Sequence, residues 1–477
     1  MLTPRNFTLF ALPLLALLSL FALRLTSISP GDPFVEAEVL VIHALNPEAG
    51  NPASVGYGWI GIDVGDLNGD SAHEFLLTDP FYSDIGQFQG KFYLHDGRTG
   101  DLLHSVDGAA ANQLLGYGAA AAGDMNGDGV PDYAISAPFG SASKLFVYSG
   151  ADNSLLHEWG VPNERFGYDV AGGADFNGDG YGDLVVGATD YNNGLAAQGR
   201  VYLLSGADGA TLWAVDGGAE NALLGAGVGI VGDVTGDGVP DVAAGAPGYD
   251  NNRGRAYLFS GSDGTLLQSY DPLPPFNSNP NSASYGRFFA DAAGDVNNDG
   301  TPDIFIGDYA GDGGNGRAYI YSGADGSLLF LLEAENAGDG FGPGRAVGDV
   351  NGDGHDDLFI AAYLYADPTT PPAVGKGYLI SGADGSVLNT ATGTNENYAL
   401  GVDALGVGDV NNDGSPDYLL TGNGSPSYVI SFVGTPTAVS LATFDSAPLG
   451  QPLWLVTLAL ALSALVVRRW YRREATR

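Results

Sequence analysis

The stretch Gly123 to Asp132 reads GDMNGDGVPD, and close copies of it decide the architecture of the whole chain. From Asp124 to Asp132 it follows the pattern D-x-N-x-D-G-x-x-D, in which acidic and amide side chains recur every two residues before the last acid. Three carboxylates this close repel each other unless a positive charge lies among them. Glycine at the sixth position permits a sharp chain reversal. The stretch therefore predicts a tight loop whose oxygens converge on a cation.

The same loop recurs along the chain, which indicates an internal repeat. The copies are DLNGDSAHE from Asp66, DMNGDGVPD from Asp124, DFNGDGYGD from Asp175, DVTGDGVPD from Asp233, DVNNDGTPD from Asp295, DVNGDGHDD from Asp349 and DVNNDGSPD from Asp409. Their starts lie 51 to 62 residues apart. That spacing holds four short strands with their turns, and no segment of helical length and period lies between the copies.

The second unit shows how each repeat is built. Its four short apolar runs are YGAAAAGD (117–124), DYAISAP (132–138), KLFVYSG (144–150) and SLLHEW (154–159). A turn close to SGADG joins the last two runs here and in four later units, and its Asp and Gly suit a tight hairpin. Seven such units predict an all-β fold, a seven-bladed β-propeller with four-stranded antiparallel blades.

The seventh unit lacks a fourth strand, because only DYLLTGN (417–423) and SYVISF (427–432) follow its loop. Residues 38–45, EVLVIHAL, precede the first unit and read as a strand. We expect them to complete the seventh blade and close the ring. The alternative is a loose N-terminal extension.

The loop chemistry favours Ca²⁺, which takes six to eight hard oxygen ligands in flexible geometry. Positions 1, 3, 5 and 9 supply side chains and position 7 a backbone carbonyl, for example that of Val130. Position 12 is apolar in every copy, which excludes an EF-hand, and Mg²⁺ demands stricter geometry. We predict up to seven calcium ions as cofactors. The predicted metal ligands are Asp66, Asn68, Asp70, Glu74, Asp124, Asn126, Asp128, Asp132, Asp175, Asn177, Asp179, Asp183, Asp233, Thr235, Asp237, Asp241, Asp295, Asn297, Asp299, Asp303, Asp349, Asn351, Asp353, Asp357, Asp409, Asn411, Asp413 and Asp417.

Any single loop has a plainer interpretation, a metal-free turn in which Asp and Asn side chains accept backbone N–H groups. That alternative is strongest at the first loop, where Ser71 replaces the glycine and Glu74 the last aspartate. In the fourth loop Thr235 stands where Asn is usual, so we expect weaker binding there.

Charge and composition narrow the function. Seven of the 18 basic residues lie near the two ends, so residues 32–450 carry 11 basic against 55 acidic residues. Such a surface repels nucleic acid and anionic lipid, and attracts divalent cations. The chain has no cysteine, which excludes disulfides, thiolate metal sites and a cysteine nucleophile. Calcium would therefore stand in for disulfides in a secreted protein.

Two apolar segments flank the repeats. Residues 7–23 follow Arg5 and predict a signal peptide or signal anchor within 1–31. Residues 447–467 predict a transmembrane helix, with a linker at 435–446 before it and a basic cytoplasmic tail at 468–477 after it. This end also resembles the sorting tails of bacterial surface proteins. We expect the propeller, residues 32–434, on the extracytoplasmic side of the membrane.

Aromatic-glycine pairs precede five of the loops: Tyr57-Gly58, Tyr117-Gly118, Phe166-Gly167, Tyr285-Gly286 and Phe341-Gly342. Leu224-Gly225 and Leu400-Gly401 keep only the glycine, and SAP, GAT and GAP triplets follow the loops at 136, 187 and 245. Together these motifs resemble the FG-GAP repeats of integrin α-subunit heads over residues 34–434. The resemblance implies a seven-bladed propeller, calcium under the blades and extracellular adhesion. The chain departs in carrying a loop in every repeat and no stalk domains, and is more similar to a prokaryotic surface relative.

Because strands alternate in direction, the metal loops and the SGADG turns should share one rim. The opposite rim collects longer loops rich in aromatic residues, as recognition surfaces often are. The candidate ligand-binding residues there are Tyr82, Tyr191, Tyr249, Phe276 and Tyr365. The alternative is that these rings pack over the core.

We expect a cell-surface binding or adhesion protein for a protein or polysaccharide ligand. The alternatives are a calcium-dependent polysaccharide lyase or hydrolase, although the six histidines form no catalytic pattern, and a structural coat protein.

Overall fold

The computed structural model describes residues 39–46, 54, 56–140, 142–274, 284–366, 373–394, 399–424 and 426–432. Within these ranges no helix has the length and apolar character needed to cross a bilayer. The predicted signal segment (1–31), linker (435–446), transmembrane segment (447–467) and basic tail (468–477) lie outside the described residues. So does Phe276.

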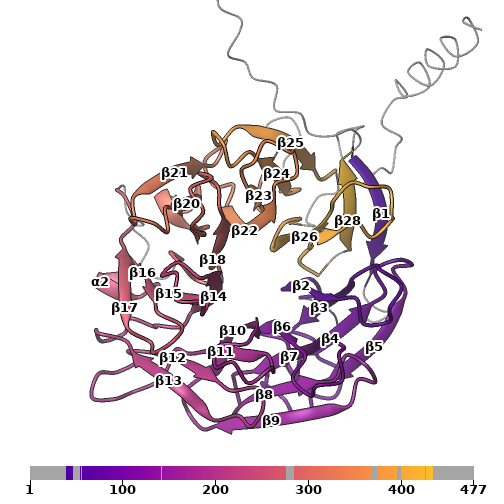
Figure 1. Ribbon diagram of the computed structural model, residues 1–477. Coiled ribbons are helices and arrows are strands. Elements are labelled where there is room, and N and C mark those ends of the chain that lie inside the picture. The colour runs from indigo at the N-terminus through magenta and orange to yellow at the C-terminus, as the bar shows by residue number, and fades with distance from the viewer. Residues whose placement is uncertain are drawn as a thin grey trace, which may run out of the picture. The chain divides into compact units, whose positions relative to one another are not determined.

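The described chain forms seven separate four-stranded antiparallel sheets, arranged as blades around one axis (Figure 1). This confirms the predicted seven-bladed propeller. The blades are, in order, β2 Gly61–Gly65, β3 Glu74–Asp79, β4 Lys91–His95 and β5 Leu102–Asp107; β6 Ala119–Gly123, β7 Asp132–Ala137, β8 Ser143–Tyr148 and β9 Leu155–Val161; β10 Phe166–Ala174, β11 Asp183–Ala188, β12 Arg200–Leu204 and β13 Thr211–Asp216; β14 Gly227–Gly232, β15 Asp241–Ala246, β16 Arg255–Phe259 and β17 Leu266–Tyr270; β18 Ala290–Gly294, β19 Asp303–Asp308, β20 Arg317–Tyr321 and β21 Leu328–Glu333; β22 Phe341–Gly348, β23 Asp357–Ala362, β24 Lys376–Ile380 and β25 Val387–Thr392; and β26 Ala404–Gly408, β27 Asp417–Leu420, β28 Ser427–Phe432 and β1 Val39–Leu45. Two single helical turns, α2 Tyr249–Asn252 and α3 Gly311–Gly314, lie in connecting loops.

The N-terminal strand closes the ring. Strand β1 pairs antiparallel with β28, from Val39 opposite Phe432 to Leu45 opposite Ser427. Its last residue, Leu45, is buried in the cluster that joins the seventh blade to the first. The predicted closure is therefore confirmed, and the two ends of the described chain are held in one sheet.

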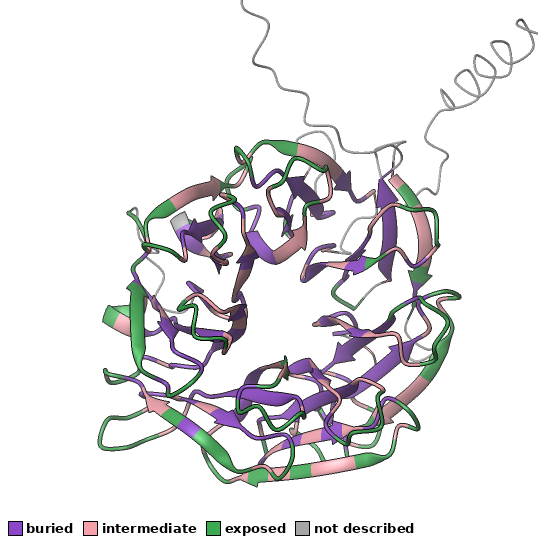
Figure 2. Ribbon diagram, in the orientation of Figure 1, coloured by how far each residue is buried: buried purple, intermediate pink, exposed green. Residues whose placement is uncertain are grey.

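The apolar interior is divided into seven clusters, each formed by two adjacent blades. Between the first two blades, for example, Leu76 and Phe92 pack with Tyr133 and Ile135. The second strand of every blade is buried throughout, because neighbouring blades cover both of its faces. Outer strands such as β5 and β9 consist of exposed and partly buried residues (Figure 2). This explains why second strands read as unbroken apolar runs.

One detail of the repeat assignment from the sequence is wrong. In the second blade Leu115-Gly116, rather than Tyr117-Gly118, occupies the aromatic-glycine position. Gly116 has φ +88° and donates its N–H to the Ser136 carbonyl at 2.8 Å, as Gly58 does to Thr78 at 2.9 Å. The positive φ favours glycine at this position. Tyr117 lies one residue further on.

Candidate metal centres

Each predicted metal loop connects the first strand of a blade to the second. The first aspartate follows the first strand, and the ninth residue begins the second strand. In every blade a change of register separates the end of the first strand from its pairing with the ninth residue. A local irregularity of this kind bends the strand and aims the loop away from the sheet.

The backbone of each loop wraps around its first aspartate. In the second loop, Oδ1 of Asp124 accepts the N–H of Gly127 at 2.7 Å and Oδ2 accepts that of Gly129 at 2.8 Å. Oδ2 of the first aspartate accepts the N–H of the sixth residue in all seven loops. In the fourth loop, the N–H of Gly238 lowers the pKa of Asp233. These donors hold the first carboxylate ionised in a fixed orientation.

The third and fifth residues bring further oxygens to the same loop. In the second loop, Oδ1 of Asn126 accepts the Asp128 N–H at 2.8 Å, and Oδ1 of Asp128 accepts the Val130 N–H at 2.8 Å. In the seventh loop, Oδ1 of Asn411 is buried and has no hydrogen-bond partner among the described residues. A buried acceptor without a donor is costly, so this oxygen suits a cation ligand.

The ninth carboxylate is fully buried in every loop, at 0% exposure from Glu74 to Asp417. In the second blade, Asp132 accepts the Met125 N–H at 2.8 Å through Oδ2 and the Gly150 N–H at 3.0 Å through Oδ1. Gly150 belongs to the turn between the third and fourth strands, and blades three to six repeat this contact. The metal loops and these turns therefore share one rim, as predicted.

Burial makes the charge of these carboxylates unfavourable. Desolvation raises the pKa of Asp303, Asp357 and Asp417 to about 6, and raises that of Asp132, Asp183 and Asp241 as well. Carboxylates of the same loop add to the effect, as Asp299 does for Asp303. A cation placed among the loop oxygens would remove this unfavourable term.

The side chains alone do not form a converged metal cluster. No group of three or more His, Asp or Glu side chains within the described ranges stands close enough to hold an ion. Two of the five predicted ligands in most loops are an amide oxygen and a backbone carbonyl. The first and ninth carboxylates of the second loop bond backbone N–H groups. The donor set still fits Ca²⁺, which accepts all of these oxygen types.

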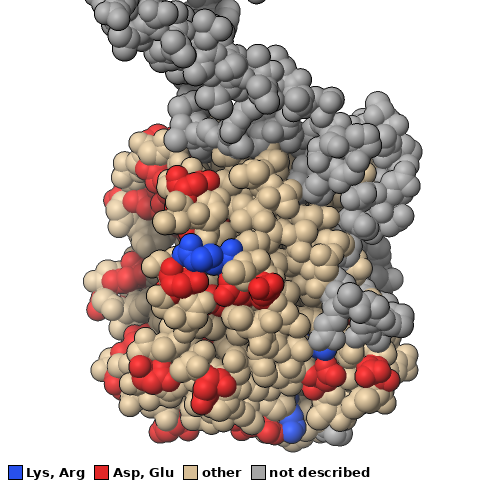
Figure 3. All heavy atoms as spheres, turned by 90° about the vertical axis from the view of Figure 1, so that its right-hand side faces the viewer, with Lys and Arg blue, Asp and Glu red and all other residues tan. Residues whose placement is uncertain are grey.

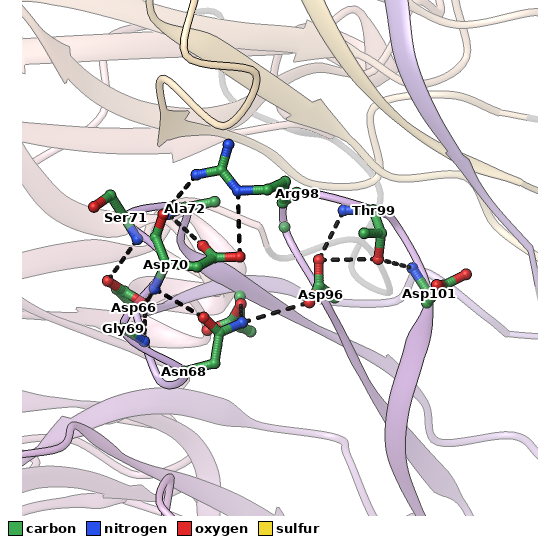
Figure 4. Close-up of polar contacts among 12 residues, drawn as sticks. Asp66, Asn68, Gly69, Asp70, Ser71, Ala72, Asp96, Arg98, Thr99 and Asp101 are labelled. Carbon is green, nitrogen blue, oxygen red and sulfur yellow. Dashed lines mark hydrogen bonds and ion pairs between the residues drawn. The ribbon is translucent and has the colours of Figure 1, made fainter.

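The first loop differs because the guanidinium group of Arg98, from a neighbouring turn, bonds to it (Figure 4). Arg98 donates from Nε to Oδ2 of Asp70 at 3.2 Å and from Nη2 to the Asp70 carbonyl at 2.6 Å. Asp70 is the fifth residue of the loop, and Arg98 lies in the turn between β4 and β5. Ser71 replaces the usual glycine and still has φ +74°. Sequence reasoning missed Arg98, although HDGRTG at 95–100 in place of SGADG was the available signal.

The candidate tyrosines on the opposite rim lie against basic residues of their own blades. The Tyr82 ring lies 5.1 Å from Lys91 Nζ, Tyr191 lies 3.7 Å from the Arg200 guanidinium, Tyr249 lies 4.3 Å from that of Arg255, and Tyr365 lies 4.9 Å from Lys376 Nζ. Tyr82 and Tyr365 are only 3% and 8% exposed, and the other two are half-buried. This placement favours the packing interpretation for Tyr82 and Tyr365, with cation–π contacts as a further stabilising term.

Large exposed apolar side chains mark the same rim, and sequence reasoning missed them. Ile85 (73% exposed), Leu195, Leu273 and Leu364 lie in its loops. On the side of the molecule shown in Figure 3, acidic side chains are more frequent than basic ones. A rim of apolar tips and half-buried tyrosines can contact a ligand by burial of surface rather than by charge.

Comparison with known protein families supports the repeat assignment. A model of the FG-GAP repeat matches residues 166–204 and 341–380, and a model of the FG-GAP-like repeat matches 233–306 and 295–360. These matches lie within the third to sixth blades.

Curated relatives include integrin alpha subunits. Integrin alpha-7 of Mus musculus is 30% identical over 151 residues, covering 29% of this chain and 13% of the relative. Integrin alpha-PS2 of Drosophila melanogaster is 33% identical over 269 residues, covering 50% of this chain and 18% of the relative. The chain thus spans less than a fifth of the length of these relatives. Among solved structures, Saccharomyces cerevisiae Sqt1 aligns with a TM-score of 0.45 and 15% identity, covering 76% of this chain and 81% of that chain.

Proposed function

We propose that this chain, which carries FG-GAP repeats and is similar in part to integrin alpha subunits, is a calcium-stabilised binding or adhesion protein of the cell surface. Its ligand would be an extracellular protein or a polysaccharide. The apolar segments at 7–23 and 447–467 support export and membrane anchoring, and the basic residues after 467 support a cytoplasmic tail. The C-terminal similarity to bacterial sorting tails supports a prokaryotic origin.

The observation that carries this proposal is the repetition of one oxygen-rich loop on one rim of the ring. Bound Ca²⁺ would neutralise the carboxylates and cross-link each loop to the blade beneath it. Within each loop, the side chains at positions 1, 3, 5 and 9 and the carbonyl at position 7 would hold the ion. The buried ninth carboxylate orients the loop by its bonds to two backbone N–H groups, and the sixth residue completes the turn.

Six of the seven loops fit this role. In the first loop the Arg98 guanidinium already bonds two oxygens of Asp70, one of them a predicted ligand, and a second cation there would meet its repulsion. The other turns carry alanine or serine at the equivalent position, for example Ala151 in the second blade. We therefore assign no calcium to the first loop.

This assignment predicts a calcium stoichiometry of six. Equilibrium dialysis of the purified chain in millimolar calcium should give six bound ions. The triple variant Arg98→Ala, Ser71→Gly, Glu74→Asp restores the loop pattern of the other blades and should bind seven. The converse variant Ala151→Arg should bind five. Seven ions on the unaltered chain, or no change in either variant, would contradict the role of Arg98.

The opposite rim is the proposed ligand surface, because its loops are long and expose apolar side chains. Tyr191 and Tyr249 are half-buried there, in the loops that lead into their third strands. Calcium on the far rim would act indirectly, by holding the blades in register so that these loops keep their relative positions.

Capture experiments test the ligand surface. The purified full chain, immobilised in calcium buffer, should retain a protein or glycan from surface extracts and release it when a chelator is added. The variant Ile85→Asp, Leu195→Asp, Leu364→Asp should lose most of this binding, because charge disfavours burial of the three tips. The matched control is Leu266→Asp, since Leu266 is 52% exposed on the outer strand β17. Equal capture by both variants would place the ligand elsewhere.

A further inference from the structure

A second candidate site lies on the axis of the ring. The first strands of the blades surround the axis (Figure 1), and residues from all seven blades line a cavity of about 430 Å³ there. This volume lies within the range of small-molecule sites. Most of the wall is apolar, and includes Ile60, Ile62, Val228, Ile230 and Phe289.

Aromatic rings gather at one end of this cavity. The Phe288 ring stacks on Tyr168, with centroids 5.6 Å apart, and meets the Trp59 ring edge-on at 5.8 Å. Trp59 comes from the first blade and Phe288 from the fifth, so the two rings meet across the axis. Phe288 has φ +66°, a left-handed conformation that is unusual for a bulky residue. Strain of this kind persists where surrounding contacts impose it, often at functional sites.

Charged side chains interrupt the apolar wall. Arg345 donates from Nη2 to Oδ1 of Asp403 at 2.7 Å, and Asp169 and Asp291 also line the cavity. Asp169 is 6% exposed and accepts the Val228 N–H at 2.9 Å. A fourth lining carboxylate, Asp63, bonds His73 at 2.8 Å. Arg345 is the one Lys or Arg among the described residues that line the cavity, so negative charge exceeds positive.

Burial makes this excess unfavourable. Desolvation raises the pKa of Asp169 to about 8 and raises the pKa of Asp291, while Arg345 acts in the opposite direction on both. Nε of Arg345 is buried and has no acceptor among the described residues. The wall therefore lacks two partners, a positive charge beside Asp169 and Asp291 and a hydrogen-bond acceptor beside Arg345.

We propose that this axial cavity binds a small organic amine with an apolar body and a hydroxyl or carbonyl oxygen near the ammonium group. The ammonium lies against Asp169 and Asp291, the oxygen accepts from Nε of Arg345, and the apolar body fills the space between Val228, Ile230 and Phe289. The lining of this site includes none of the predicted metal ligands and none of the exposed apolar side chains of the opposite rim.

Calorimetric titration of the purified full chain with 2-amino-1-phenylethanol tests the proposal. We expect saturable binding of one equivalent, at least about tenfold tighter than that of the neutral isostere 1-phenylethane-1,2-diol, because a charge-assisted hydrogen bond replaces a neutral one. Asp291→Asn keeps the shape of the side chain and should abolish this preference. The matched control Asp152→Asn removes an exposed carboxylate from a turn on the rim and should change nothing.

A cavity-filling variant distinguishes loss of binding in the cavity from an effect of Asp291→Asn on folding. Ala121→Trp narrows the cavity without changing its charge and should abolish binding of both compounds, with thermal unfolding measured to confirm that each variant is folded. Equal affinity for the amine and the diol would overturn the proposal by reducing the site to an apolar pocket. Absence of amine binding at millimolar concentration would overturn it as well.

Discussion

Removal of calcium by a chelator lowers the melting temperature of this chain by about 10 °C. Extracellular calcium modules bind with Kd of ~10⁻⁴ to 10⁻³ M, so a tenfold excess of calcium contributes about 1.4 kcal/mol per site. Six sites contribute about 8 kcal/mol, which is comparable with the whole stability of many domains. An unfolding entropy of about 2.1 cal/mol/K per residue over about 400 residues converts this into the stated shift. Differential scanning calorimetry measures it directly.

The control for this experiment is re-addition of ions. Excess calcium should restore the melting temperature, whereas magnesium at the same concentration should restore little of it because it dehydrates reluctantly and demands stricter geometry. Equal melting temperatures with calcium and with chelator would show that the loops are metal-free turns.

The substitution Asp132→Ala should have one of the largest effects of any single change on the metal rim. It leaves the buried N–H groups of Met125 and Gly150 without an acceptor, and each such group costs about 1 to 3 kcal/mol. It also removes a calcium ligand from the second loop. We expect a loss of about 3 to 5 kcal/mol in the free energy of unfolding, measured by denaturant titration in calcium.

The matched control lies in the same blade. Asp152 accepts the Ser154 N–H at 2.9 Å in the turn beside Asp132, but it is exposed. Asp152→Ala should therefore lower the free energy of unfolding by less than about 1 kcal/mol. If the two variants were equally stable, the buried ninth carboxylate would not be the link between loop and turn that the structure indicates.

Most of the architecture could be predicted from the sequence because each blade carries the same local signals. The loop and the second-strand run recur in all seven blades, a turn close to SGADG recurs in five, and residues 38–45 could be matched to the one missing strand. Periodicity placed the loops and the turns on one rim, and the bond from Asp132 to Gly150 shows that they touch.

The features that could not be predicted depend on contacts between segments far apart in the chain. Spacing alone did not distinguish Leu115-Gly116 from Tyr117-Gly118. The two pairs differ in the structure, because Gly116 has a positive φ and donates its N–H to the second strand. The tyrosines of the opposite rim looked like exposed recognition residues, but Tyr82 and Tyr365 are buried beside lysines that begin the next strands.

The axial cavity illustrates the same limit. Asp169, Asp291 and Asp403 are separated by more than a hundred residues from one to the next, and each looks like an isolated polar residue in or beside a first strand. Only the closed ring brings them to one cavity with Arg345. In contrast, Arg98 and Asp70 lie in one blade. The replacement of SGADG by HDGRTG was a signal in the sequence from which their contact could have been predicted.

The central claim is that Ca²⁺ ions hold the oxygen-rich loops together, and a crystal structure of the chain grown in millimolar calcium tests it most directly. We predict a calcium ion in each of the six loops from Asp124 to Asp417, coordinated by five protein oxygens and water, and Arg98 without an ion in the first loop. Loops that contain only solvent under these conditions would contradict the claim.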